Sequence, residues 1–179
     1  APSPTPVVDR VKELLDLQNQ GPVNPEVSAR VAACEPELRE HFGRVFGADA
    51  NEIALTHSTS EGINIVSWSL DWKPGDEVIT TPFSFVASSN VIEYVGARPV
   101  FVDIEPDTCL IDVSGVEAKI TERTRAILPV HLYGQPCDVA PLLELAERHN
   151  LVLVEDACQA FAVLVGEMDS LAAPSPGYL

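Results

Sequence analysis

The sequence predicts an α/β protein whose mostly parallel sheet lies between two layers of helices. Apolar runs typical of buried strands alternate with helical patterns along most of the chain. The run at residues 151–155 is apolar until its last position, as expected for a strand buried on both faces of a parallel sheet. The runs begin about 22 to 26 residues apart, which is the spacing of successive βα units. Right-handed crossovers between such units give a three-layer α/β fold.

Residues 1–50 are predicted to form a helical arm that leads into the sheet. Alternating prolines at the start favour an extended entry, and a helical pattern follows near residues 7–17. A second helix is expected from Asn24 and Pro25, which are typical of a cap and a first helical position, to about Phe46.

The sheet domain is predicted at residues 51–160, with an irregular carboxyl tail at residues 161–179. Its five expected strands are the apolar runs at residues 52–56, 77–81, 99–104, 125–130 and 151–155. The helices expected between them lie at residues 60–70, 84–95, 113–120 and 141–149. Asp138 before the last helix and Gly96 after the second fit the rules for helix caps.

Charge and hydropathy exclude several kinds of partner. The 179 residues include 27 acids and 11 bases, for a net charge of −16. A surface this acidic repels nucleic acid and anionic membranes, so neither is expected as a partner. The apolar runs are too short to span a bilayer and the amino terminus shows no signal pattern, which together predict a cytoplasmic protein.

The cysteines and histidines are too scattered to predict a metal site. Four of each are present, and the cysteines lack the CxxC spacing of zinc ligands. We therefore expect reduced cysteines and no bound metal. Cys158 lies close to Asp156, but no base is next to it in the sequence, so a nucleophilic role is disfavoured.

Two loops at the carboxyl ends of predicted strands carry polar groups. Asp156 follows the last strand, where open α/β sheets bind ligands, although an acid there also suits a cap of the next turn. Residues 56–62 place hydroxyls and N–H groups at a helix start, a pattern that suits either a phosphate or an ordinary cap. The glycine-rich motifs of common nucleotide sites are absent from the sequence.

Two further loops at the same edge carry rings. Phe83 and Phe85 compete for a stacking role, since most aromatics in such loops belong to the core. His131 and Tyr133 lie in a loop that also holds glycine and proline, and a lone histidine is more often structural than catalytic. Because the carboxyl ends of parallel strands share one edge, the four loops together predict a ligand site there.

Four segments resemble the pyridoxal-phosphate-dependent sugar aminotransferases of the DegT type. They are GDEVITTPFSFVASSN (75–90), GARPVFVDI (96–104), PVHLYGQP (129–136) and EDACQA (155–160). Residues 20–75 instead resemble class V aminotransferases, through GPVNPEV (21–27) and EIALTHSTSEGIN (52–64). Both groups share the type I fold, so the resemblance implies the amino-terminal part of the large domain of a transferase that uses pyridoxal phosphate (PLP).

The resemblance also implies roles for individual residues. Asp156 pairs with the pyridine nitrogen and keeps it protonated, Gln159 contacts the ring hydroxyl and Phe85 stacks on the ring. The full set implied to hold the cofactor, with the phosphate on the three hydroxyl residues, is Ser58, Thr59, Ser60, Phe85, Asp156 and Gln159. The residues implied on the substrate side are His131 and Tyr133.

The lysine that such enzymes need for covalent chemistry has no counterpart in this sequence. The lysines are Lys12, Lys73 and Lys119, and none stands in a segment like Ser-Phe-x-x-Thr-Lys. Residues 161–164 also fail to continue as His-Gly-Ala, as the resemblance would require. No catalytic residue is therefore assigned, and we expect a partial or rearranged form of the fold that does not transaminate alone.

Several functions stay open from the sequence. One is an aminotransferase acting on a keto-sugar or similar small carbonyl with an amino donor. Another is a non-catalytic remnant that binds the cofactor or a partner, or a relative of class V desulfurases and epimerases. A third is an unrelated α/β domain for a phosphorylated ligand. The unfinished sheet leaves apolar surface that needs a partner, which predicts a homo-oligomer.

Overall fold

The computed structural model describes residues 5–19 and 25–160. The chain divides into two compact units, Ala1–Leu55 and Thr56–Leu179, which we call the helical unit and the α/β unit. The tail predicted at residues 161–179, the start of the proline-rich entry and the expected Asn24 cap lie outside the described residues.

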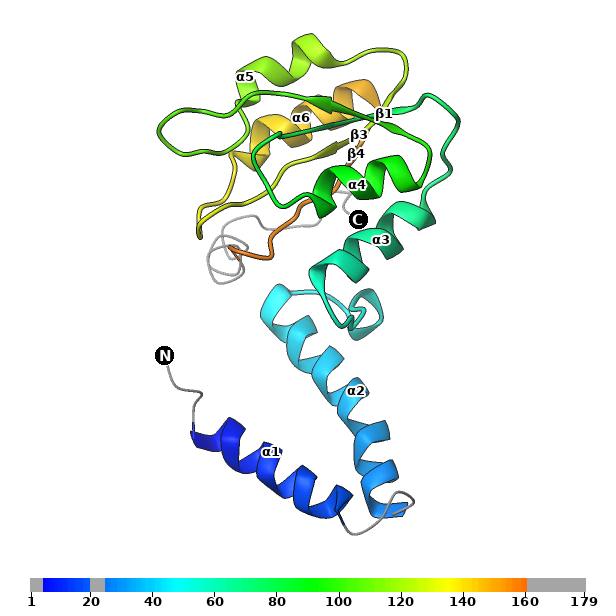
Figure 1. The fold of residues 1–179 in the computed structure, drawn as a ribbon, viewed down its shortest axis with the longest axis vertical. Coiled ribbons are helices and arrows are strands. Elements are labelled where there is room, and N and C mark those ends of the chain that lie inside the picture. The colour runs from blue at the N-terminus through cyan, green and yellow to red at the C-terminus, as the bar shows by residue number, and fades with distance from the viewer. Residues whose placement is uncertain (1–4, 20–24, 161–179) are drawn as a thin grey trace. The chain divides into compact units, whose positions relative to one another are not determined.

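Two helices make up most of the helical unit, as the sequence predicts. They are α1 (Thr5–Gln18) and α2 (Pro25–Phe46) (Figure 1). Arg30 of α2 donates to the carboxylate of Glu13 in α1 over 2.7 Å, an exposed ion pair of a kind that adds little stability. Gly47 follows α2 with a φ of 67°, a conformation that glycine adopts without strain.

The strand predicted at residues 52–56 is wrong. The structure has a short 3-10 helix, η1 (Ala50–Glu52), and irregular chain after it. The side chain of Asp49 accepts the N–H of Asn51, and the Glu52 carboxylate accepts the N–H of Asp49, both over 2.8 Å. These reciprocal bonds favour a turn, and the apolar residues that follow have no strand beside them in the described chain.

Within the described residues, four parallel strands form the sheet in the order β2-β1-β3-β4 (Figure 1). Their bounds are Glu77–Thr80 for β1, Arg98–Phe101 for β2, Thr124–Leu128 for β3 and Val152–Leu153 for β4. Each strand overlaps a predicted apolar run, although each is shorter than the run. The parallel α/β fold is therefore confirmed, with β1 and β3 in the middle of the sheet.

The helices of the α/β unit follow the predicted pattern with one break. Their bounds are Thr59–Ser69 for α3, Ala87–Tyr94 for α4, Val113–Val116 for α5, Glu117–Lys119 for the 3-10 helix η2 and Val139–His149 for α6. The single helix expected at residues 113–120 is thus divided into α5 and η2. Asp138 takes the N-cap position of α6, but its side chain makes no capping hydrogen bond.

Alternate residues of the strands point to opposite sides of the sheet and build two apolar layers. On one side, Ile79 and Ile127 pack in a cluster with residues of α5 and α6. On the other side, Val78 and Ala126 pack with residues of α3 and α4. The predicted three-layer arrangement is therefore confirmed.

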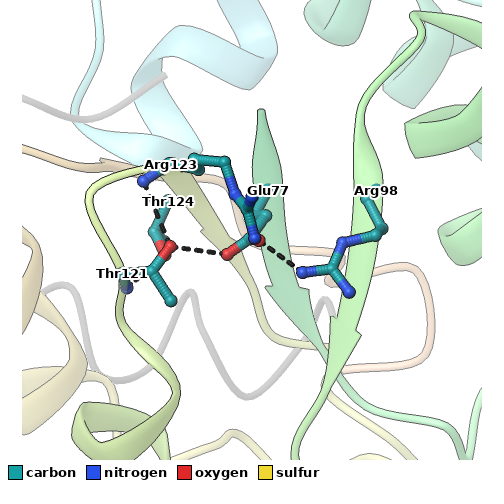
Figure 2. Close-up of polar contacts among 5 residues, drawn as sticks. All are labelled: Glu77, Arg98, Thr121, Arg123 and Thr124. Carbon is teal, nitrogen blue, oxygen red and sulfur yellow. Dashed lines mark hydrogen bonds and ion pairs between the residues drawn. The ribbon is translucent and has the colours of Figure 1, made fainter. Parts of the chain in front are cut away.

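A buried carboxylate lies at the amino-terminal edge of this sheet (Figure 2). Glu77 begins β1, and its side chain is fully buried. Arg98 of β2 pairs with it, and Arg123, just before β3, places Nη2 2.7 Å from Glu77 Oε1. Thr121 Oγ1 donates to the other carboxylate oxygen over 2.7 Å. This cluster ties three neighbouring segments together at the edge opposite the carboxyl ends of the strands.

Membrane-spanning helices and groups of metal ligands are both absent from residues 5–19 and 25–160. No helix in these ranges is both long and apolar enough to cross a membrane. No three described histidine, cysteine, aspartate or glutamate side chains are grouped in a way that could hold a metal ion. The cysteines are free thiols, with Cys137 buried and Cys158 exposed.

Candidate functional site

Asp156 lies directly beyond β4, at the carboxyl edge of the sheet. Its backbone is tied to the segment after β3, because its N–H donates to Pro129 O over 3.0 Å and its C=O accepts the N–H of His131 over 2.9 Å. Its carboxylate accepts from Ser88 Oγ in α4 at 3.4 Å and from the Cys158 N–H at 3.3 Å. No cation pairs with Asp156 within the described residues, so a half-buried negative charge remains with two long hydrogen bonds.

The two interpretations of Asp156 left open by the sequence are both visible in this geometry. The bond from the Cys158 N–H is a local turn contact, as the capping interpretation requires. The contact with Ser88 comes instead from a helix 68 residues earlier in the chain. A cap alone does not explain that second contact, which keeps the carboxylate on the α4 side of the sheet.

Gln159 and Tyr133 meet at the same edge. Gln159 Oε1 accepts the N–H of Tyr133 over 3.1 Å, which leaves the amide N–H₂ group of Gln159 for another acceptor. Tyr133 has a φ of 57°, an uncommon conformation for a bulky residue, and its side chain is exposed. Residues held in such conformations often lie in ligand sites, so the strain here supports a functional role for this loop.

His131 occupies a different environment from the substrate-facing one that the resemblance implies. Its ring is fully buried, Nδ1 accepts the N–H of Cys137 over 2.9 Å, and Nε2 lies 2.9 Å from Glu155 Oε2. Because Nδ1 accepts a main-chain N–H, the proton of the neutral ring is on Nε2, which donates to Glu155. Both nitrogens are thus used inside the chain, and direct contact of this ring with a substrate is not supported.

The amino terminus of α3 has an ordinary N-cap, and its use as an anion site stays a prediction. Ser58 is the N-cap, and its Oγ accepts the N–H of Glu61 over 3.2 Å, as the capping interpretation requires. The N–H groups of Thr59 and Ser60 precede the first bonds inside the helix and point out of its end. These N–H groups and the helix dipole favour an anion. The carboxylate of Glu61, in the first turn of α3, accepts the N–H of His57 over 2.6 Å.

A contact between Thr59 and Cys158 joins the anion site to the Asp156 turn. The Thr59 side chain lies close enough to the Cys158 thiol, two residues after Asp156, to affect the pKa of that thiol. The start of α3 and the turn after β4 therefore lie side by side in the folded unit. Thr59 and the turn that holds Asp156 and Gln159 therefore lie at one edge, and their role in holding a cofactor stays a prediction.

The loop between β1 and α4 presents an aromatic side chain. Phe85 is 70% exposed, against 44% for Phe83, so Phe85 is the freer of the two candidates to stack on a ligand. The N–H of Ser88 donates to Phe85 O over 3.1 Å, which fixes this residue at the start of α4. Phe85 is thereby positioned three residues before the Ser88 side chain that contacts Asp156.

Ser88 and Glu155 are parts of the site that the sequence did not predict. Ser88 reaches Asp156 across 68 residues of chain, and no local pattern indicates such a contact. Glu155 was the expected end of a strand, and its partner His131 was assigned to the substrate. The available signal was Glu155 itself, an acid at the end of a run predicted to be buried. A carboxylate in that position needs a partner inside the fold.

A surface hollow lies elsewhere along the same edge. It has a volume of about 460 Å³ and is lined by residues at or just after the ends of β1 and β2, among them Phe101 and Asp103, and by residues of the α5–η2 segment, among them Lys119. None of the residues predicted to hold the cofactor lines it. Because it lacks Asp156, Gln159 and the amino terminus of α3, we place the functional site at Asp156 and not in this hollow.

The thiol of Cys158 is expected to react slowly with iodoacetamide. Burial and the neighbouring Asp156 carboxylate raise the pKa of Cys158, so little reactive thiolate is present at pH 8. Replacing Asp156 by Asn should lower that pKa and speed alkylation severalfold, as measured by mass spectrometry of the Cys158 peptide. Asp103→Asn, the same change in an exposed acid that lines the separate hollow, should leave the rate unchanged; equal rates in both variants would contradict the assignment.

Comparison with known proteins places this fold in a family. A sequence model of the DegT/DnrJ/EryC1/StrS aminotransferase family matches residues 28–170. The chain therefore belongs to this family, whose members depend on PLP, and the resemblance found at residues 75–160 is confirmed. The match also includes residues 28–75, so the class V resemblance of that part stays a prediction.

Individual relatives agree with this family. The chain is 55% identical over 87 residues to GDP-perosamine synthase from Caulobacter vibrioides, covering 49% of this chain and 24% of the relative. The aminotransferase TlmJ from Streptoalloteichus hindustanus is 33% identical with a TM-score of 0.68, over 72% of this chain and 35% of that one. The protein ntda from Bacillus subtilis, with bound cofactor pmp, is 32% identical with a TM-score of 0.64, over 84% of this chain and 34% of that one.

The matches cover only part of each relative. The chain spans between 24% and 32% of the length of the first curated relatives that it matches. It therefore corresponds to a part of the aminotransferase large domain.

Proposed function

We propose that the α/β unit is the cofactor-binding part of a PLP-dependent sugar aminotransferase and binds PLP at the carboxyl edge of its sheet. The observation that carries this proposal is the Asp156 carboxylate, which Ser88 of α4 holds at the carboxyl edge and which no cation pairs with in the described residues. Thr59, at the anion site of α3, lies near enough to Cys158 in the same turn to affect the pKa of its thiol. One ligand with a phosphate group and a protonated ring nitrogen is able to engage both.

The residues at this edge fit that ligand chemically. The Asp156 carboxylate has two long hydrogen bonds and no cation within the described residues, so a protonated pyridine nitrogen supplies the partner it lacks. The N–H groups of Thr59 and Ser60 suit the phosphate. The free amide of Gln159 donates to the ring hydroxyl, and the exposed ring of Phe85 covers one face.

When bound, PLP supplies an electron-accepting ring for chemistry at the carbon that carries the amino group. Asp156 holds the proton on the ring nitrogen and so keeps that ring electron-poor. Ser88 and the Cys158 N–H hold the carboxylate in place through its two oxygens. Tyr133 is exposed beside Gln159 and is the described residue best placed to contact a substrate.

Covalent attachment of the cofactor needs a lysine that the described site does not contain. Lys12 lies in the helical unit, and Lys73 precedes β1 at the opposite edge of the sheet. Lys119 lies in η2 and lines the separate hollow. We therefore propose that this chain binds PLP without a covalent bond. A keto-sugar substrate, an amino donor and self-association belong to the same proposal, by analogy with the family.

Titration with PLP, followed by absorbance, tests the proposal. We expect saturable binding, weaker binding of pyridoxal, which lacks the phosphate, and a loss of about tenfold or more in affinity for Asp156→Asn. Asp103→Asn is the matched control and should bind as the wild type does. Borohydride reduction and mass mapping should find no lysine adduct.

Each contrary result has a definite meaning. A stoichiometric adduct on Lys119 would replace non-covalent binding with a rebuilt covalent site. An absence of saturable binding, or equal binding by Asp156→Asn, would overturn the assignment of this edge to PLP.

A further inference from the structure

We infer that His131 and Glu155 are positioning residues that aim the Asp156 carboxylate at the ring nitrogen of the cofactor. This inference rests on the proposed function. The observation behind it is a set of hydrogen bonds with two parts. The ring of His131 is bonded to the Glu155 side chain, and the backbone of His131 is bonded to the backbone of Asp156.

The backbone hydrogen bonds of this set fix the position of Asp156 along the direction of the strands. The His131 N–H donates to Asp156 O over 2.9 Å, and the Asp156 N–H donates to Pro129 O over 3.0 Å. Val130 and Asp156 form the corresponding parallel bridge. Asp156 is therefore bound to the residues on both sides of Val130, although no regular strand continues this far.

The side-chain part fixes the rotation of the chain about its own axis. Successive residues of an extended chain point to opposite faces, so holding Glu155 on one face directs Asp156 to the other. Glu155 is held by His131 Nε2 over 2.9 Å, and Asp156 faces Ser88 of α4. The ring of His131 is itself held by the Cys137 N–H over 2.9 Å, so it has no freedom to turn.

The burial of this pair argues against a simple packing role. His131 is fully buried, and the contacts of its ring are the Cys137 N–H and the Glu155 carboxylate. An apolar side chain would fill this volume without the cost of burying an imidazole. The imidazole adds a directional hydrogen bond to Glu155, which is the residue directly before Asp156.

A comparison of two ligands tests the inference. PLP and its analogue with carbon in place of the ring nitrogen differ only at the atom that Asp156 contacts. The ratio of their Kd values therefore measures this contact alone. We expect the wild type to prefer PLP about tenfold, and Glu155→Ala to reduce that ratio towards one. Glu155→Gln keeps an acceptor for His131 Nε2–H and should retain the preference.

His131 gives an independent pair of variants. His131→Asn places its amide near the position of Nδ1 and loses the bond to Glu155, so the preference should fall. His131→Gln reaches the position of Nε2 and should keep it. Glu155→Ala tests the same bond from a half-buried position if His131→Asn fails to fold. Equal weakening of both ligands, with the ratio unchanged, would assign the pair a purely structural role and overturn the inference.

Hydrogen exchange in the free protein separates this inference from the proposed function. The amides of His131 and Asp156 should exchange at least about tenfold faster in Glu155→Ala than in Glu155→Gln, since the hydrogen bond between His131 and residue 155 is lost only in the first variant. If the wild type binds neither ligand, the proposed function fails and these rates still decide whether Glu155 restrains Asp156. Unchanged exchange in Glu155→Ala would overturn the inference even where PLP binds.

Discussion

We expect the double substitution Arg98→Ala with Arg123→Ala to lower the free energy of unfolding of the α/β unit by about 3–5 kcal/mol, more than the sum of the two single changes. Each single variant leaves Glu77 with one guanidinium and the Thr121 hydroxyl. The double variant leaves a fully buried carboxylate without a cation (Figure 2). Urea unfolding followed by tryptophan fluorescence measures the effect, because both tryptophans, Trp68 and Trp72, belong to this unit.

Two further variants identify the cause. Adding Glu77→Gln to the double variant removes the unpaired charge and should restore part of the lost stability. Arg148→Ala is the matched control, since its partner Glu117 is exposed and the change should cost less than about 1 kcal/mol. Strictly additive single changes, or no recovery with Glu77→Gln, would show that the buried charge is not what the arginines stabilise.

Acid should destabilise the wild type through the same carboxylate. Hydrogen bonding by Thr121, together with Arg98 and Arg123, lowers the pKa of Glu77 from 4.5 to about 2. A carboxyl whose pKa is depressed by folding contributes stability above its unfolded pKa and loses it as the pH falls towards the folded value. The contribution, about 3 kcal/mol, is therefore complete above about pH 4.5 and lost between pH 4.5 and 2.

Comparison with Glu77→Gln isolates this group from the other acids of the chain. The difference in unfolding free energy between wild type and variant should be constant from pH 5 to 7 and shrink as the pH approaches 2. Urea unfolding at a series of pH values gives that difference directly. A difference that stays constant down to about pH 2 would mean that Glu77 titrates alike in the folded and unfolded chain.

The sequence predicted best where local pattern and tertiary structure agree. The continuous apolar run before Asp156 required burial on both faces, and β4 lies in the sheet there. The same reasoning failed at residues 52–56, where an apolar pattern exists but the reciprocal cap of Asp49 makes a turn. An apolar pattern indicates which side chains a strand would bury. A strand also needs a neighbouring strand to pair with, and the pattern does not indicate whether one is present.

The site was predicted in its parts and not in its internal contacts. The position of Asp156 followed from the buried run that precedes it, because the carboxyl ends of parallel strands share one edge. The burial of His131 did not follow, since its ring is held by the Cys137 N–H six residues later and by Glu155, which lies beyond β4. The contact from Ser88 likewise exists only once α4 has packed on the sheet. Such contacts belong to the folded unit and carry no local signature.

The strand order also governs how this unit is assembled during synthesis. Arg98 follows Glu77 by 21 residues and Arg123 follows it by 46, so β1 gains its β2 neighbour well before its β3 neighbour. At elongation rates of about 5–20 residues per second, the 46 residues from Glu77 to Arg123 take about 2–9 s, and the second side of β1 stays unpaired for at least that time. An unpaired strand edge is a template for wrong pairing during that interval. The exposure of the nascent chain to misassembly is therefore set by the place of β3 in the sequence.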